Sequence, residues 1–433
     1  MKESVWTATA ELPRFPKLEG DKTTDVLIIG GGLCGILCAY FLKQAGIDCI
    51  LAEGGKIADG ATGNTTAKIT SQHGLIYDTL SKSRGKDIAQ RYLTANQNAL
   101  STYKTLCQNI DCDFTVKPAY TFSLTSREKI IKEVKAVNAL GFPAQYKERL
   151  ELPFQTLGAV CFPDQAQFHP LKFLRAIAKG LPIYENTFIR NLTPTTAVAD
   201  SGKITAKKII VATHFPFLNK HGSYFLKLYQ HRSYVSAYAQ AQALDGMYVD
   251  EDLNGLSFRT HHDLLLIGGG SHRTGKQGGA WNAIHDAAAA YYPAAKLKYE
   301  WATQDCMSLD AIPYIGRYAA RTPNLYVASG FHKWGMTSSM VAANILCDLV
   351  LEKENDFAPV FSPQRSMLKP QLLINGFEAT VNLLTPTAKR CPHLGCALKW
   401  NRYEHSWDCP CHGSRFAEDG RCLNNPANGN AKW

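Results

Sequence analysis

The stretch Asp25-Val-Leu-Ile-Ile-Gly-Gly-Gly-Leu-Cys-Gly35 joins a short apolar run to the pattern G-x-G-x-x-G. The run predicts a buried parallel strand, residues 33–46 continue with helical spacing, and residues 48–53 predict a second strand. In such a βαβ unit the first glycine permits a tight turn, the second lets backbone N–H groups approach a pyrophosphate, and the third allows close packing of helix on sheet. Glu53 follows Gly30 by 23 residues, where an acidic side chain accepts hydrogen bonds from ribose hydroxyls. The stretch therefore predicts a dinucleotide site.

Further signals extend this unit into a larger architecture. Residues 207–213 and 324–330 each predict a short buried strand, and residues 336–351 predict a helix that closes the nucleotide-binding domain. Alternating apolar and polar residues over 224–267 predict an antiparallel sheet, the usual form of a substrate domain. A second glycine run, residues 268–273, lacks the third glycine and a following apolar helix. It predicts a strand end in the substrate domain and no second nucleotide site.

Composition excludes several classes of protein. The net charge of +10 comes from basic residues scattered along the chain, without a basic stripe that contains aromatic residues, so we expect no nucleic-acid binding. The first residues lack the apolar core of a signal peptide, and the longest uncharged apolar run, residues 26–42, falls short of the roughly 18 residues of a membrane span. We expect a cytoplasmic protein without a transmembrane segment. For such a protein, thirteen cysteines indicate reduced, metal-bound or catalytic residues more than a disulfide framework.

Four segments, residues 58–74, 210–214, 310–316 and 329–337, resemble in this order the FAD-dependent oxidoreductases of the D-amino acid oxidase and glycine oxidase superfamily. The resemblance covers roughly residues 20–350 and implies FAD as the dinucleotide. It also implies that residues 329–337 place backbone groups around the flavin ring. The expected FAD contacts are Gly30, Gly32, Leu33, Cys34, Gly35, Glu53, Thr62, Thr66, Ala212, Thr213, Gly330, Gly335, Met336 and Thr337.

The strongest signal is a group of cysteines and histidines near the end of the chain. The segment Cys391-Pro-His-Leu-Gly-Cys396 is followed, after twelve residues, by Cys409-Pro-Cys-His-Gly-Ser414. One C-x-H pair and one C-x-x-H pair supply the two thiolates and two imidazoles that hold a Rieske [2Fe-2S] cluster, with both histidines on one iron. A zinc site uses the same kinds of ligand, but it usually separates a Cys pair from a His pair.

Order and spacing in these two segments resemble the Rieske proteins of cytochrome bc complexes. In the high-potential relatives a tyrosine lies where Phe416 stands here, so one hydrogen bond to cluster sulfur is lost and we expect a lower reduction potential; Ser414 remains as a donor. Only about twenty residues separate the linker from Cys391, so we expect the flavin domain or a neighbouring subunit to cover part of the cluster. The resemblance implies the cluster ligands Cys391, His393, Cys409 and His412, and a disulfide between Cys396 and Cys411.

Together these signals predict an α/β fold, α+β overall, in three parts. A FAD-binding Rossmann-like domain holds an inserted antiparallel-sheet substrate domain, and a small all-β Rieske domain follows. The expected ranges are 1–355 for the FAD-dependent oxidoreductase (FAD-binding parts about 20–80, 160–215 and 305–352, substrate domain about 82–160 and 216–304), 356–370 for the linker and 371–433 for the Rieske domain.

Catalytic residues are less well marked. His332 and Lys333 lie in the segment expected at the flavin, and His272 with Arg273 ends a strand of the substrate domain; each could bind a carboxylate or polarise a substrate, and an ordinary structural role competes with this hypothesis. Cys306 lies in a segment that resembles the flavin-linking cysteine region of sarcosine oxidases, which raises covalent attachment of FAD as an alternative.

The two centres together indicate oxidation of a small-molecule amine or amino acid by FAD, with electrons passing through the cluster to an external one-electron carrier. Residues 264–270 contain no lysine where relatives that resemble sarcosine oxidase hold an oxygen-activating one, which favours a dehydrogenase. The alternatives are a reductase whose Rieske domain accepts electrons from a ferredoxin-like donor, and a non-catalytic electron carrier or redox sensor. The oligomeric state is left open by the sequence.

Overall fold

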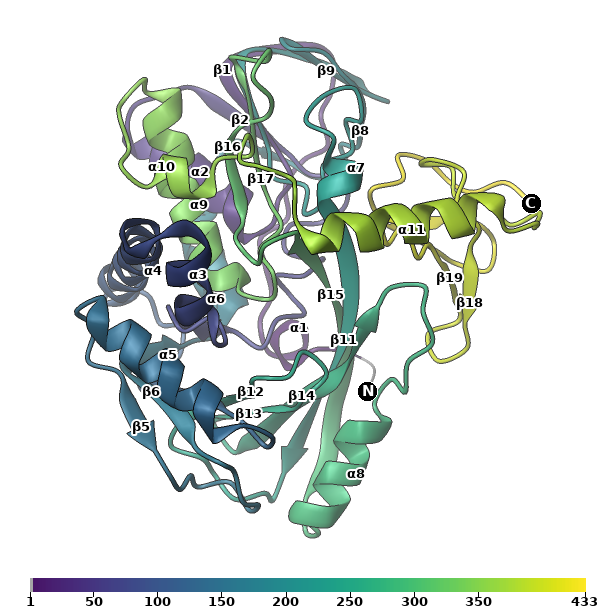
Figure 1. Ribbon diagram of the computed structural model, residues 1–433. Helices are drawn as coiled ribbons and strands as arrows, with labels where there is room; N and C mark the ends of the chain where they lie inside the picture. The colour runs from purple at the N-terminus through teal and green to yellow at the C-terminus, as the bar shows by residue number, and fades with distance from the viewer. Residues whose placement is uncertain (1–2) are drawn as a thin grey trace.

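Strand β1 lies in the middle of an eight-stranded sheet, whose main order is β16-β17-β10-β1-β2-β7 (Figure 1). The computed structural model describes residues 3–433. β1 pairs in parallel with β2 and β10, and residues 26–29 are buried, which confirms the strand predicted from the apolar run. The strands are β1 (Lys22–Ile29), β2 (Cys49–Ala52), β7 (Ile183–Tyr184), β8 (Ile189–Leu192), β9 (Thr196–Ala199), β10 (Gly202–Val211), β16 (Tyr314–Arg317) and β17 (Leu325–Ser329).

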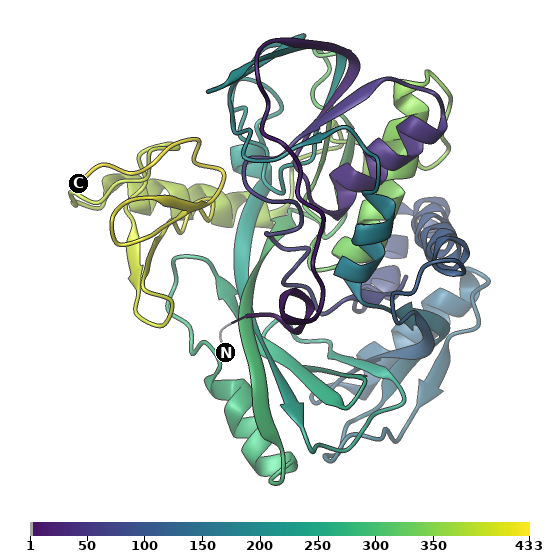
Figure 2. The same ribbon diagram turned by 180° about the vertical axis from the view of Figure 1, so that it is seen from behind.

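Helices α2 and α9 lie side by side against this sheet, and α4 packs on α9 (Figures 1 and 2). α2 begins directly after the glycine turn and α9 follows β17, so both predicted helices are confirmed. Their apolar side chains form one continuous core with the sheet and with the N-terminal residues Val5 and Trp6. The helices of this part are α1 (Val5–Thr9), α2 (Leu33–Gln44), α3 (Ile76–Arg84), α4 (Lys86–Cys107), α5 (Arg127–Ala139), α6 (Pro170–Ile177) and α9 (Gly335–Val350).

A nine-stranded sheet forms the second part of the fold, in the order β15-β11-β14-β13-β12-β4-β6-β3 with β5 beside β6. Its pairs are antiparallel except for β12 with β4, so the predicted antiparallel substrate domain is confirmed with one parallel pair. The elements are β3 (Lys68–Ile69), β4 (Thr115–Phe122), β5 (Gln145–Lys147), β6 (Ala159–Gln167), α7 (Tyr224–Lys227), β11 (Leu228–Ala239), β12 (Met247–Asp250), β13 (Ser257–His261), β14 (Leu264–Arg273), α8 (Asn282–Tyr291) and β15 (Lys296–Ser308).

Two expected boundaries shift because strands pair across them. The FAD-binding part was expected to resume near residue 160, a range that includes β6. β6 instead pairs with β4 and belongs to the nine-stranded sheet. β15 likewise continues to Ser308 along β11, a few residues past the expected end of the substrate domain at 304. The glycine run of residues 268–270 lies inside β14, as a strand of the substrate domain.

The expected linker is a packed segment. It contains the short helix α10 (Ala358–Phe361), in which Val360 and Phe361 are buried, and Arg365 Nη2 lies 2.7 Å from Asp310 Oδ1. The segment expected as a linker over 356–370 thus contacts the flavin part through these residues, which charge and proline content alone do not reveal.

The C-terminal part contains a four-stranded antiparallel sheet, in agreement with a small Rieske domain. A helix that the sequence did not predict, α11 (Pro370–Leu384), precedes the sheet and runs from the flavin part toward it (Figure 1). The strands are β18 (Lys399–Asn401), β19 (Ser406–Asp408), β20 (Arg415–Phe416) and β21 (Cys422–Asn424). Over residues 3–433, no helix has both the length and the apolar composition that crossing a membrane requires.

Candidate functional site

The glycine turn at the end of β1 has the geometry that a dinucleotide site needs. Gly30 has φ 112°, a left-handed conformation that favours glycine, and a Cβ atom there would collide with the carbonyl oxygen of Ala212. A Cβ atom on Gly35 would collide with the carbonyl oxygen of Gly30, so the third glycine is required for close packing of α2 against the turn. The two glycines therefore allow α2 to begin directly at the turn, and Gly30, Gly32, Leu33 and Cys34 line a cavity there.

Glu53 lies at the end of β2 and is held by two backbone groups. Gly31 N–H donates to Oε2 at 2.6 Å and Gly55 N–H donates to Oε1 at 2.7 Å. Burial raises the pKa of Glu53, whereas these two hydrogen bonds lower it. Thr62 Oγ1 accepts a hydrogen bond from Leu33 N–H at 3.0 Å, at the first turn of α2. These contacts fix an acidic acceptor and the first turn of α2 at the glycine turn, the groups that the ribose and pyrophosphate of a dinucleotide use.

A cavity of about 1040 Å³ runs from this turn to the nine-stranded sheet. Twelve of the fourteen expected FAD contacts line it; Gly35 and Thr337 do not. Thr337 donates to the carbonyl oxygen of Thr70 and contacts His73 Nε2, both at 3.0 Å, so it fixes the cavity wall from behind. The lining residues are Gly30, Gly32, Leu33, Cys34, Glu53, Thr62, Thr66, Ala212, Thr213, Gly330, Gly335 and Met336.

His332 and Lys333 lie in the turn between β17 and α9, and both line the cavity. Their φ angles, 51° and 70°, are left-handed, a strain that tertiary contacts must maintain. Lys333 Nζ donates to Ser271 Oγ at 2.6 Å and to the carbonyl oxygen of Leu253 at 3.2 Å. Burial lowers the pKa of Lys333, and burial together with the charge of Lys333 lowers the pKa of His332 to about 4. His332 is therefore neutral at pH 7.

His272 does not join this group. It stacks on Tyr234 with ring centroids 5.8 Å apart, its Nδ1 lies 3.1 Å from the carbonyl oxygen of Gly270, and it does not line the cavity. Neighbouring residues of a strand point to opposite faces, and in β14 it is Ser271 that faces the cavity. The prediction of His272 as a catalytic candidate is corrected on this ground.

Two cavity residues from other segments escaped the sequence argument. Lys68 Nζ lies 3.4 Å from Ser257 Oγ, and Ser257 pairs with Gly268 of β14. The structure thus places Lys68 next to β14, although residues 264–270 of that strand contain no lysine. The lack of a lysine in this strand therefore no longer favours a dehydrogenase. Burial lowers the pKa of Lys68 to about 7. Asp305 of β15 also lines the cavity, and burial raises its pKa. Lys68 lies within residues 58–74, one of the segments that resemble FAD-dependent oxidoreductases, and this position was the sequence signal that could have identified it.

Cys306 is buried beside the cavity, with Sγ 3.5 Å from Ser329 Oγ. Burial raises the pKa of its thiol to about 12, although the contact with Ser329 lowers it. A protonated thiol is a poor nucleophile. The structure therefore gives no support for a covalent bond to FAD at this residue.

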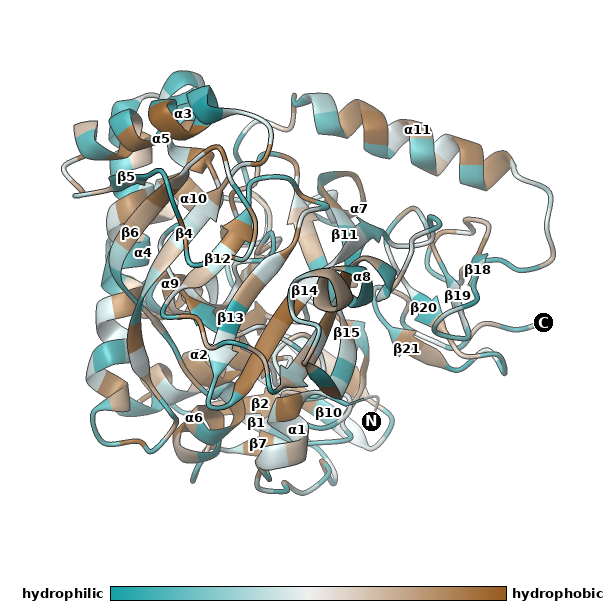
Figure 3. Ribbon diagram, turned by 90° about the horizontal axis from the view of Figure 1, so that it is seen from below, coloured by the Kyte–Doolittle hydropathy of each residue, from teal (hydrophilic) through white to brown (hydrophobic). Residues whose placement is uncertain are grey.

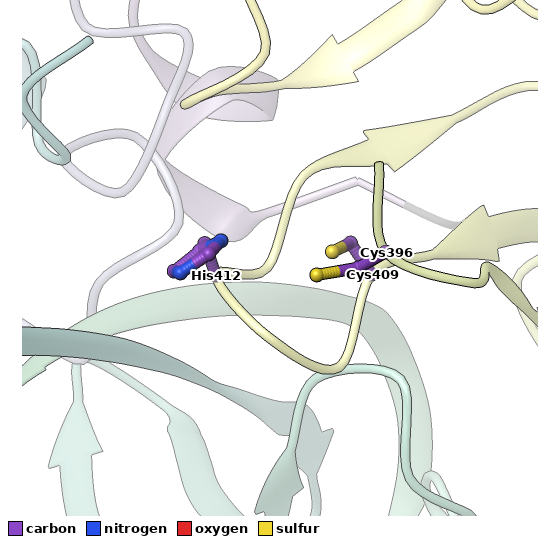
Figure 4. Close-up of side chains that lie close together, drawn as sticks. All are labelled: Cys396, Cys409 and His412. Carbon is purple, nitrogen blue, oxygen red and sulfur yellow. The ribbon is translucent and has the colours of Figure 1, made fainter. Parts of the chain in front are cut away.

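The two loops with the expected cluster ligands lie together on the side of the small domain that faces the flavin part. His393 Nδ1 and His412 Nδ1 are 3.3 Å apart, a separation that suits two ligands of one iron. A disulfide joins Cys396 to Cys411, as the resemblance implies. Cys409 Sγ lies within 4.8 Å of a ring nitrogen of His412 (Figure 4).

The outer nitrogen of each histidine contacts the flavin part. His412 Nε2 lies 2.9 Å from the carbonyl oxygen of Phe225, which can only accept, so His412 donates from Nε2 and its Nδ1 keeps a lone pair. His393 Nε2 lies 3.0 Å from Asn219 Oδ1. Partners of this kind orient metal-ligating histidines. Of the two covers expected for the cluster, the flavin domain or a neighbouring subunit, these contacts favour the flavin domain.

The thiols of Cys391 and Cys409 interact with each other. Their hydrogen bond raises the pKa of Cys391 well above its ordinary value and lowers the pKa of Cys409. Hydrogen bonds from the backbone N–H groups of residues 411–413 also lower the pKa of Cys409. Ser414 contributes a hydrogen bond that lowers the pKa of Cys391. Two adjacent thiols, one stabilised as thiolate, and two histidines with inward Nδ1 atoms fit a Rieske cluster. Phe416 is fully buried in the place where high-potential relatives have tyrosine.

Two glutamines connect the cavity to the cluster loops. Gln230 of β11 and Gln304 of β15 both line the cavity. Gln230 Nε2 donates to the carbonyl oxygen of His412 at 2.7 Å, and Gln304 Nε2 donates to that of Gly413 at 2.8 Å. The ring of Phe215, just beyond the cavity residue Thr213, has its centroid 6.1 Å from that of His412. Gln230 and Gln304 thus form a wall that the cavity and the cluster loops share, and we name it the shared wall. No local sequence motif predicts it.

An ion-pair network holds the small domain on β11. Arg232 Nε donates to Glu404 Oε1 at 3.0 Å, and Arg415 Nη2 donates to Glu404 Oε2 at 2.9 Å. Burial raises the pKa of Glu404, but the charges of the two arginines lower it more, to about 2. Arg415 also binds Asp408 Oδ1 at 3.0 Å. The carboxylate between two guanidinium groups is therefore ionised at neutral pH.

Comparison with known proteins agrees with both sites. The family "FAD dependent oxidoreductase" matches residues 25–349, and the family "Rieske [2Fe-2S] domain" matches residues 377–432. YhfW of Bacillus subtilis (strain 168), which carries the name of a Rieske 2Fe-2S iron-sulfur protein, is 36% identical over 98% of this chain and 96% of its own length. Gamma-glutamylputrescine oxidoreductase of Escherichia coli (strain K12) is 23% identical over 78% of this chain and 85% of its own.

Solved structures show the same fold for the larger part. Glycine oxidase from Geobacillus kaustophilus superposes with a TM-score of 0.67 and 20% identity, and covers 80% of this chain and 100% of its own. L-amino acid deaminase from Proteus vulgaris gives a TM-score of 0.65 and 16% identity, and covers 82% of this chain and 100% of its own. With the match over residues 25–349 and the Rieske match that follows, the chain belongs to the FAD dependent oxidoreductase family and carries a C-terminal Rieske [2Fe-2S] domain.

Proposed function

We propose that this chain oxidises an amine or amino acid with FAD and passes the electrons through its Rieske cluster to an external one-electron acceptor. The observation that carries the proposal is the shared wall: Gln230 and Gln304 line the cavity and hold the cluster loop by the carbonyl oxygens of His412 and Gly413. When bound, FAD accepts a hydride from a substrate and releases electrons one at a time. The adjacent cluster suits that second task.

The cluster ligands we propose are Cys391, His393, Cys409 and His412. Asn219 and the carbonyl oxygen of Phe225 hold the histidines from the flavin side. The histidine tip of the small domain therefore faces the flavin part, and an acceptor in solution has to approach from another side. This orientation supports electron flow from flavin to cluster within the chain.

The polar groups of the cavity support an amino acid as substrate. Lys333 and Asp305 both face the cavity. Burial lowers the pKa of Lys333 and raises that of Asp305, and a bound substrate carboxylate would favour the protonated form of Lys333. Such a pair can bind a carboxylate at one end and an amino group at the other. His332, neutral at pH 7, is placed to accept a proton from the substrate amine. We propose Lys333 as the residue that binds the substrate carboxylate.

The test is anaerobic addition of amino acids and polyamines to the purified protein. We expect bleaching of the flavin absorbance, followed by the electron paramagnetic resonance signal of a reduced Rieske cluster. A different result would support the reductase instead: no amine changes the spectra, and a ferredoxin-like donor reduces the cluster without bleaching the flavin. If no reductant except dithionite changes the flavin absorbance or the cluster signal, the result would support the non-catalytic carrier.

Lys333→Met tests the binding site within this scheme. We expect a loss of kcat/KM on the order of 100-fold for an amino acid, because the substrate carboxylate loses its cation in a water-poor site. Lys298→Met, an exposed lysine on β15, is the matched control and should keep wild-type rates. Equal rates in the two variants would exclude Lys333 from substrate binding.

A further inference from the structure

Helix α11 lies at the edge of the molecule and contains several hydrophobic residues (Figure 3), and many of these side chains are exposed. Five side chains form what we name the α11 face, and their exposed fractions are far above those of buried residues. They are Leu373 (77%), Ile374 (51%), Phe377 (69%), Val381 (44%) and Leu384 (78%). Apolar side chains gathered on one exposed face are typical of an interaction surface.

The opposite face of α11 is fixed to the rest of the chain by polar contacts. Asn375 is buried; its Nδ2 donates to the carbonyl oxygen of Leu226 at 3.2 Å, and its Oδ1 accepts from Arg273 at 2.9 Å. Glu378 pairs with Lys276 at 2.6 Å. The carbonyl oxygen of Asn382 accepts a hydrogen bond from Ala397 N–H at 2.9 Å. The helix cannot turn its apolar side inward without breaking these contacts, so the α11 face stays exposed in a single chain.

The spacing of the face is that of a helix-to-helix seam. Ile374 and Val381 are seven residues apart, as are Phe377 and Leu384, and the two series are offset by three. These are the a and d positions of two heptads, with β-branched residues at a, the pattern that favours two-helix association. A seam of this kind is complementary to a second helix of the same sequence.

The charges of α11 favour a second copy of the chain over a membrane surface as the partner of the α11 face. α11 contains no lysine or arginine, and its one charged residue, Glu378, is paired with Lys276 on the inner side. Helices that lie in a membrane interface carry basic residues on their polar face. Two copies of the α11 face, by contrast, meet without bringing like charges together.

Further exposed apolar residues lie near α11 along the chain. They are Leu368, just before the helix, Leu383 within it and Leu394 after it. An isologous interface uses the same patch twice, as a closed dimer requires.

We propose that the α11 face is the interface of a homodimer in which α11 of one protomer packs against α11 of its partner. The proposal does not depend on the redox function, so its failure and that of the proposed function are distinguishable. It concerns the full chain with both cofactors bound.

The double variant Phe377→Glu with Leu384→Glu tests this interface by light scattering after size exclusion. At about 50 µM chain, well above a micromolar dissociation constant, we expect the wild type to elute as two chains of 47.8 kDa and the variant as one. Four carboxylates facing one another should raise the dissociation constant at least on the order of 100-fold. Flavin and cluster absorbance should be unchanged, because both side chains are exposed within one chain.

Leu124→Glu with Leu157→Glu is the control, because these leucines of the substrate domain are similarly exposed and carry the same charge change. We expect this control to remain dimeric. A monomeric wild type, or a dimer that persists in the α11 variant, would overturn the proposal. Binding of the monomeric wild type to vesicles with anionic phospholipid, lost in the α11 variant, would assign the face to a membrane instead.

Discussion

Glu404→Gln removes the charge on which the contact between the small domain and β11 depends. The Glu404 carboxylate is only 11% exposed and lies between Arg232 and Arg415, whose side chains are 5% and 7% exposed. Its pKa is lowered to about 2 from the ordinary 4.5, chiefly by the two arginines acting against burial. At about 1.4 kcal/mol for each unit of pKa, this corresponds to about 3 kcal/mol of stability at pH 7. Loss of one partner of a buried ion pair generally costs about 3–5 kcal/mol, which agrees.

Because the folded-state pKa of Glu404 is lowered, its contribution is fully present above the unfolded-state pKa and is lost as pH falls toward 2. The assay is urea unfolding at pH 7 and at several lower pH values, followed by the visible circular dichroism of the cluster. We expect the difference between wild type and variant to be constant from pH 7 to about 5 and to shrink below that. Glu418→Gln, an exposed carboxylate beside His405, is the control and should match the wild type. A difference below about 0.5 kcal/mol at pH 7 would refute the assignment of this network to stability.

Four further predictions concern the two cofactor sites. Gly35→Ala should yield protein without FAD, because a Cβ atom meets the carbonyl oxygen of Gly30; retention of the ordinary flavin-to-protein absorbance ratio would contradict this. Cys409→Ser should abolish the Rieske signal in electron paramagnetic resonance while FAD remains bound, and an intact signal would remove Cys409 from the ligands. Phe416→Tyr should raise the reduction potential of the cluster by about 60 mV if the hydroxyl donates to cluster sulfur, as a redox titration would measure; no change would mean that the ring does not reach it. Acid denaturation should release FAD from the wild type, because the Cys306 thiol has its pKa raised to about 12 by burial, and flavin that stays with the precipitated protein would disprove this.

Local motifs predicted the glycine turn and the two loops that carry cysteine and histidine. The turn at Gly30 and the helix after it depend on neighbouring residues and on the absence of Cβ atoms, so the sequence of eleven residues was sufficient. The cluster loops are similar, because each supplies one cysteine and one histidine within four residues. The short buried strands were also recognisable, since a parallel strand covered on both faces is apolar throughout.

Contacts between distant segments were not predictable in this way. His272 was expected in the site, but the direction of its side chain depends on which face of β14 meets the cavity. Lys68 reaches the same sheet from residues far earlier in the chain, through a hydroxyl of Ser257. Residues 356–370 were expected as a spacer, although Arg365 pairs with Asp310. Each outcome follows from strand pairing and packing that a residue's immediate neighbours do not specify.

The sequence by itself predicted a dinucleotide site near Gly30 and a group of cysteines and histidines near Cys409, because both are built from short contiguous segments. Only the tertiary structure decided how the two sites meet. Gln230 and Gln304 lie on strands β11 and β15, which pair with each other, and that pairing points both amides at the cluster loop. Side chains brought together by long-range pairing leave no local pattern, and this is why the shared wall and the outward face of α11 became visible only in the fold.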